Sequence, residues 1–149
     1  MSTNQNQEHG WYETMPVPIA ANSGVGPIAN DPLVFGRGTS PDFGLAGVAE
    51  TSYTPPSGTA TGSISVNFEG VYLLSVVGKD AIGGSNLAIA PGDKVYADGG
   101  TYDLTTGCLY GFTLNGNASS GAYFGNSLDA VVAGATTTVR VRLKKSGGG

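Results

Sequence analysis

Two segments of the chain alternate apolar and polar side chains. Over Ser63–Phe68, the apolar residues Ile64, Val66 and Phe68 are separated by small polar residues, which is the two-residue period of a strand with one buried face. Residues 135–146 have the same period, with β-branched side chains that favour extended backbone. Both segments are therefore predicted to be strands.

A glycine divides the longest apolar region. Gly70 follows the first alternating segment, and the next residues, Val71–Val77, form a nearly continuous apolar run. A glycine inside a strand pattern often marks a bulge or a bend. We predict that the chain turns a corner at Gly70 and contributes to two parts of a barrel or sandwich.

Turn-forming residues separate several further short strands. Lys94–Ala97 and Thr101–Leu104 flank Asp98-Gly99-Gly100 and are predicted to form a hairpin. The other predicted strands are Leu33–Phe35, Leu45–Ala49, Cys108–Leu114, Ala122–Phe124 and Ala130–Ala133. Gly and Pro leave room for no more helix than one short turn near residues 81–89. The pattern predicts one mainly β domain with little helix, a β-barrel or β-sandwich of short strands.

The two ends of the chain lack this pattern. The first ten residues are polar and have no hydrophobic period, so residues 1–15 are predicted to be an extended, flexible N-terminal arm. Residues 16–145 are assigned to the β domain, and residues 146–149 to a flexible tail.

Large apolar side chains lie at the base of the predicted arm. Trp11 and Tyr12 are adjacent, and Met15 follows them. The aromatic pair either docks the arm onto its own domain or anchors the arm to another chain, since aromatic residues are favoured in interfaces. In the second case, we expect residues 1–15 to bind between subunits.

Low charge narrows the range of partners and locations. Only 12% of the 149 residues are charged, about half the usual share, and the net charge is −4. We expect no nucleic-acid partner, because that affinity depends on clustered Lys and Arg. No apolar run approaches the roughly 18 residues of a membrane span, and residues 1–9 do not resemble a secretory signal. The protein is expected to stay in the cytoplasm or in an assembly built there.

Residue types that carry catalysis or bind metals are scarce. His9 and Cys108 are the only residues of their kinds, so no His/Cys metal site and no nucleophile with a well-positioned base are expected. The acidic residues are spread singly, mostly in predicted turns. Gly78-Lys79 lacks two defining residues of a phosphate-binding loop, because Leu73 replaces the first Gly and Asp80 the hydroxyl residue. We expect no enzyme activity, no metal and no cofactor.

Basic residues are concentrated near the C-terminus. Arg140, Arg142 and Lys144 share one face of the predicted strand, and Lys145 follows them. This face is either a solvated surface that discourages edge-to-edge aggregation or a strip that binds an acidic partner. A free monomer normally carries charged residues over its surface for solubility, so the low overall charge favours a surface that lies largely against partners. The alternative is a monomer with a polar, uncharged surface.

Five short segments occur in a fixed order along most of the chain. They are Asn30–Gly36 (NDPLVFG), Gly47–Thr51 (GVAET), Val66–Leu74 (VNFEGVYLL), Pro91–Tyr96 (PGDKVY) and Thr138–Leu143 (TVRVRL). In this order they resemble segments of the phage capsid cement family, once catalogued as a domain of unknown function. Some members of that family are labelled recombinase-like, a label that the incomplete phosphate loop does not support.

The resemblance implies a β-barrel or β-sandwich that binds the outside of a phage head, commonly as a homotrimer. Such a protein is made in the host cytoplasm and reinforces contacts between capsomers of the major capsid protein, often through an N-terminal arm. The residues expected to contact the capsid or a neighbouring subunit are Trp11, Tyr12, Met15, Arg140 and Arg142.

Two other functions fit the same sequence. One is a different virion component, such as a head fibre or a tail part. The other is a carbohydrate-binding β-sandwich, in which several aromatic side chains form a platform for stacking against sugars. The candidates for that platform are Trp11, Tyr96, Tyr102, Tyr110 and Tyr123; the alternative is that these tyrosines are buried in strands.

Overall fold

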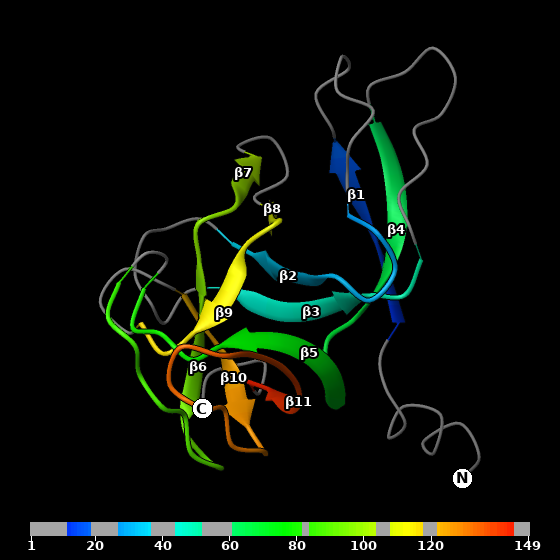
Figure 1. Ribbon diagram of the computed structural model, residues 1–149. Helices are drawn as coiled ribbons and strands as arrows, with labels where there is room; N and C mark the ends of the chain where they lie inside the picture. Colours follow the sequence, from blue (N-terminus) through cyan, green and yellow to red (C-terminus); the bar gives the residue numbers. More distant parts are fainter. Residues whose placement is uncertain are drawn as a thin grey trace, which may run out of the picture.

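A computed structural model describes the protein at residues 12–18, 27–36, 44–51, 61–81, 84–103, 108–117 and 122–144. These residues contain eleven strands and no helix. The prediction of a mainly β fold, a barrel or sandwich of short strands, is therefore confirmed. The strands divide into two groups, which are connected by shared core residues (Figure 1).

Five strands close into a barrel in the order β10-β11-β5-β9-β6. Their bounds are β5 (Val71–Val77), β6 (Lys94–Asp98), β9 (Thr113–Asn115), β10 (Ala122–Ser127) and β11 (Thr136–Leu143). Most neighbours are antiparallel, and the longest pairing joins β5 and β11 from Val71↔Arg142 to Val77↔Thr136. The exception is β5 beside β9, which is parallel and is paired only at Val76↔Leu114.

The other six strands form an antiparallel sheet in the order β1-β4-β3-β2-β8-β7. Their bounds are β1 (Tyr12–Pro18), β2 (Pro32–Phe35), β3 (Leu45–Ala49), β4 (Thr61–Asn67), β7 (Thr101–Asp103) and β8 (Cys108–Tyr110). In Figure 1, β2 and β3 cross above β5, while β1 and β4 stand upright at one side. This sheet therefore lies over one side of the barrel.

The predicted corner at Gly70 is confirmed. The strand before it, β4, belongs to the six-stranded sheet, and the strand after it, β5, belongs to the barrel. Gly70 has a φ of 116°, a conformation that residues with a Cβ rarely adopt. Its carbonyl accepts a hydrogen bond from the amide of Leu143 at 3.0 Å, which fixes the corner to the end of β11.

The predicted hairpin over residues 94–104 is wrong. The strand β6 pairs with β9 and β10 in the barrel, whereas β7 pairs with β8 in the other sheet. Because both edges of β6 are already hydrogen-bonded, no edge remains for β7. Gly99 and Gly100, at φ 78° and 85°, carry the chain from one sheet to the other instead of folding it back.

Three further differences from the sequence analysis follow from turns and proline. The predicted strand 108–114 is two strands, β8 and β9, because the chain turns at Gly111 (φ 70°). Residues 130–133 form only an isolated bridge from Val131 to Ile89. The strand β1 was not predicted, since Pro16 and Pro18 interrupt its pattern; proline is tolerated there because β1 lies at the sheet edge.

The strand β1 overlaps the end of the predicted arm. Residues 12–15 pair with β4 from Tyr12↔Asn67 to Met15↔Ile64. Residues 1–11, the rest of the arm, lie outside the described residues, as do residues 145–149.

Two hydrophobic cores lie on opposite faces of the same sheet. Val34 on β2 joins the main core inside the barrel, whereas its neighbours Leu33 and Phe35 join a second core on the other face. In the main core Phe112 and Phe124 meet edge to face at 5.8 Å, and in the second core Phe35 meets Phe68 at the same distance. The side chain of Cys108 is fully buried in the second core. The alternation along β2 and β3 thus connects barrel and sheet.

Candidate functional site

The strand β11 has the two faces that its sequence predicts. Val139, Val141 and Leu143 are buried in the main core, and Arg140 and Arg142 between them are exposed. The two arginines therefore project from the outside of the barrel.

Exposed apolar side chains lie beside these arginines. Leu73 on β5 is opposite Arg140 and is 68% exposed, and Val71 is opposite Arg142 and is 46% exposed. Large apolar side chains with this exposure cost free energy in water when they are left uncovered. This part of the barrel therefore combines exposed apolar and cationic side chains.

Arg140 is held by an ion pair within the protein. Its Nη2 lies 2.6 Å from Asp129 Oδ1, its Nε donates to the same carboxylate, and its backbone amide donates to Oδ2 at 2.9 Å. Side-chain and backbone hydrogen bonds from Arg140 lower the pKa of the Asp129 carboxyl to about 2. Asp129 thus engages Nε and Nη2 of Arg140 and offsets part of its positive charge.

A second group of cations surrounds an aromatic ring on β10. The Nζ atoms of Lys94 and Lys144 lie 5.1 and 5.9 Å from the centroid of the Tyr123 ring, within the range of cation–π attraction. Tyr96 on β6 lies beside the same ring, with the centroids 6.0 Å apart. We call Lys94, Tyr96, Tyr123, Asn126 and Lys144 the Tyr123 cluster.

Strand register connects the Tyr123 cluster to β11 and β5. Asn126 pairs with Lys94 on one side and with Arg142 on the other, and Arg142 pairs with Val71. The row Lys94–Asn126–Arg142–Val71 therefore crosses four neighbouring strands. We call the surface made by the Tyr123 cluster, the two arginines, Val71 and Leu73 the outer face.

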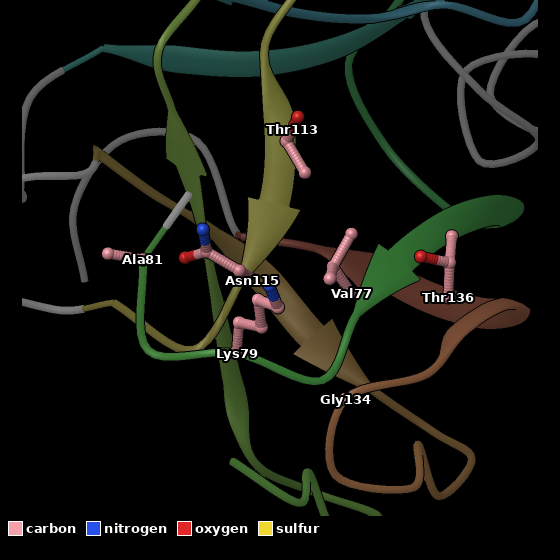
Figure 2. Close-up of a pocket in the computed structure, with 7 residues that line it drawn as sticks. All are labelled: Val77, Lys79, Ala81, Thr113, Asn115, Gly134 and Thr136. Atoms are coloured by element: carbon pink, nitrogen blue, oxygen red, sulfur yellow. The ribbon is translucent and has the colours of Figure 1, made fainter. Parts of the chain in front are cut away.

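A hollow of about 300 Å³ lies on another side of the barrel, between β5 and β9 (Figure 2). Its lining includes Lys79, Asn115, Thr113 and Thr136. The Asn115 amide is already engaged, because it donates to Asp98 at 3.0 Å and accepts from the amide of Asn117 at 2.8 Å. The described lining contains no histidine, cysteine or carboxylate.

The segment after β5 does not have the geometry of a phosphate loop. The amides of Gly78, Lys79 and Asp80 donate to the carbonyls of Ala135, Val77 and Ser85, at 2.7 to 3.0 Å. A phosphate loop needs such amides free to face the ligand. Lys79 instead forms an isolated β-bridge with Asn86.

The described residues among the sequence-predicted contacts lie on two strands, β11 and β1. Arg140 and Arg142 lie on the outer face, while Tyr12 and Met15 lie on β1 in the six-stranded sheet, with side chains outside the described residues. Trp11 also lies outside the described residues. Lys94 is a neighbour of the arginines that the sequence does not indicate, since only the pairing of β6 with β10 places it there.

The tyrosines proposed as a sugar platform are divided between the two sheets. Tyr96 and Tyr123 lie on the barrel, whereas Tyr102 and Tyr110 lie on β7 and β8. The planes of the first two rings are inclined at 56°, so they do not present one flat surface. Tyr110 packs against the second core. The tyrosines whose burial is described are partly exposed, so they are not simply buried in strands.

Comparisons with models of known families, with curated proteins and with solved structures found no match. Within the described ranges, no group of three or more His, Cys, Asp or Glu residues is placed to hold a metal ion. The same residues include no helix that is long and apolar enough to cross a membrane. The outer face is therefore the best-supported candidate site.

Proposed function

We propose that this chain is a structural virion protein, a capsid cement or decoration protein without catalytic activity. It binds the outer surface of a phage head and stabilises contacts between capsomers of the major capsid protein. The resemblance of five segments to the phage capsid cement family further implies that it acts as a homotrimer on the exterior of the virion.

The observation that carries this proposal is the outer face. Leu73 and Val71 are exposed apolar side chains beside Arg140 and Arg142 on adjacent strands. Arginine is enriched in protein interfaces, and the chain as a whole is poor in charge. A partner that covers this face would remove apolar area from water and add ionic contacts at its border.

The positions of the five family-like segments support the same function. Each segment includes part of a described strand: β2, β3, the β4–β5 corner, β6 and β11. The resemblance therefore covers both the barrel and the six-stranded sheet, and it includes the turn at Gly70 and the strand that carries both arginines.

The direct test is binding to purified phage heads that lack the protein. We expect it to sediment with the heads and to add density to their outer surface in cryo-electron microscopy. Sedimentation of the free protein should show a trimer. If the protein binds tails or fibres instead, it is a different virion component; if it binds no phage particle, the proposal is wrong.

A truncation tests the proposed role of the arm. Removing residues 1–11 deletes Trp11 but keeps β1 and its pairing with β4. Burying one aromatic side chain contributes about 2–3 kcal/mol, so we expect head binding to weaken about 30-fold or more while the melting temperature stays unchanged. Undiminished binding would contradict a role for Trp11 and leave the outer face as the candidate contact.

A further inference from the structure

Asn115-Gly116 is the only Asn-Gly pair in the sequence. In a flexible chain, the backbone nitrogen of such a glycine attacks the Cγ carbon of the asparagine, and ammonia leaves as a succinimide ring forms. Water then opens the ring to aspartate or isoaspartate. Glycine favours the reaction because, without a Cβ, it leaves its nitrogen unhindered and its backbone free to rotate. The chain therefore contains one position at which this covalent modification is chemically easy.

The folded protein holds both partners of this reaction in place. The Asn115 side chain is only 1% exposed. Its Nδ2 donates to Asp98 Oδ2 at 3.0 Å, and its Oδ1 accepts from the backbone amide of Asn117 at 2.8 Å. The attacking nitrogen, that of Gly116, donates to the carbonyl of Lys79 at 2.9 Å. The reaction must break these hydrogen bonds before Gly116 can reach the Cγ carbon, so the closed fold opposes it.

The hydrogen bond from Gly116 to Lys79 crosses the barrel junction that has the fewest strand pairs. The strands β5 and β9 are paired only at Val76↔Leu114, and Lys79 follows β5 as Gly116 follows β9. We call this junction the β5–β9 seam. The hollow of about 300 Å³ lies at the seam, and both Lys79 and Asn115 line it (Figure 2). Separation of β5 from β9 at the seam would therefore release the attacking nitrogen and expose Asn115 to water.

We propose that Asn115-Gly116 is a deamidation site controlled by the β5–β9 seam: it is inert while the seam is closed and reacts when the seam opens. This inference is independent of the proposed function. Local opening of a folded protein requires less free energy than global unfolding, and regions held by few contacts open most easily. The rate of deamidation at Asn115 therefore follows the fraction of molecules in which the seam is open.

Deamidation makes closure of the seam less favourable. A carboxylate at position 115 has no N–H to donate to Asp98 and places a second negative charge beside it. Asn115→Asp reproduces the aspartate product, and we expect its melting temperature at pH 7 to be lower by about 5 °C or more. The loss should be smaller near about pH 4, where one carboxyl can hold a proton and donate it to the other. An unchanged melting temperature at pH 7 would overturn this effect of the modification.

Two substitutions of the same size separate opening of the seam from global unfolding. Val76→Ala and Val141→Ala both shorten fully buried side chains of the main core, but only Val76 lies at the seam. Denaturant unfolding measures the global stability of each variant. After correction for that difference, we expect folded Val76→Ala to deamidate about tenfold faster than folded Val141→Ala. Equal corrected rates would mean that only global unfolding exposes the pair, and they overturn control by the seam. Lys79→Gln should react at the wild-type rate, because only the backbone carbonyl of Lys79 holds Gly116.

The decisive test needs only the wild type, folded or unfolded in urea, during incubation in warm, mildly alkaline buffer. Peptide mass spectrometry measures conversion at Asn115, and an enzyme that methylates isoaspartate detects the second product. We expect conversion to be about 100-fold slower or more in the folded protein. In the unfolded chain, Gly116→Ala should slow conversion, because its Cβ hinders the attacking nitrogen. Equal rates in the folded and unfolded wild type overturn the inference.

Discussion

The barrel and the six-stranded sheet differ in whether every strand has a hydrogen-bonded neighbour on both sides. Each barrel strand has a partner on both sides, although β5 and β9 are paired only at Val76↔Leu114. The sheet ends at β1 and β7 among the described residues. The main core holds fifteen buried residues and the second core six, again among the residues described. The outer face thus lies on the region with the larger described core.

At the boundary between the barrel and the six-stranded sheet, two strands contribute to both cores. Alternate residues of β2 and β3 enter different cores: Val34, Ala46 and Val48 join the main core, whereas Leu33 and Phe35 join the second. Loss of the main core should therefore unfold both regions. Loss of the second core should leave much of the barrel intact, since most of the barrel core comes from its own strands and loops.

The largest expected effect is on the barrel core. Phe124→Ala removes a fully buried ring that meets Phe112 edge to face, and we expect a loss of about 3–5 kcal/mol in the free energy of unfolding. Denaturant unfolding followed by circular dichroism measures it, with the exposed Leu73→Ala as a control that should change stability by less than about 0.5 kcal/mol. If Phe124→Ala does not fold, Phe124→Leu provides a milder form of the test. A loss below about 1 kcal/mol for Phe124→Ala would contradict the described core.

A smaller and more local effect is expected in the second core. Phe35→Ala should cost about 2–4 kcal/mol, because Phe35 is buried against Phe68 in the smaller cluster. Hydrogen exchange should accelerate in β2, β3 and β8 more than in β10 and β11, since the barrel strands keep their own partners. Equal acceleration in both groups would show that barrel and sheet unfold as one unit.

The positions of several strands could be predicted from the sequence, but the pairing of strands could not. Several strands were predicted almost to the residue: β3 and β5 have the predicted bounds, and β11 has the predicted buried face. The partners of strands were not: the turn at Gly99-Gly100 has the composition of a hairpin, yet it connects two sheets. Pairing depends on which strand edges other parts of the chain have already occupied, and local pattern does not contain that information.

Only part of the outer face could be predicted from the sequence, because the rest depends on which strands pair. The exposure of Arg140 and Arg142 follows from the two-residue period of one strand. The Tyr123 cluster requires β6, β10 and β11 to lie side by side, with Asn126 in register with both Lys94 and Arg142. The pairing of Asp129 with Arg140 also depends on the fold, since the carboxylate reaches the strand from a bend eleven residues away.

The smallest expected effect tests whether surface charge contributes to the stability of the barrel. Asp129→Asn removes the ion pair with Arg140, and we expect a small decrease in melting temperature at pH 7, less than either core substitution causes. The pKa of Asp129 is lowered from 3.8 to about 2, so its contribution is present above about pH 4 and is lost as pH falls towards 2. The difference in melting temperature between wild type and variant should therefore close over that range. In a double-mutant cycle, adding Arg140→Gln to Asp129→Asn should cost less than Arg140→Gln alone, because its partner is already gone. A difference that persists unchanged at pH 2 would mean that Asp129 stabilises the bend by its shape and hydrogen bonding, with no contribution from its charge.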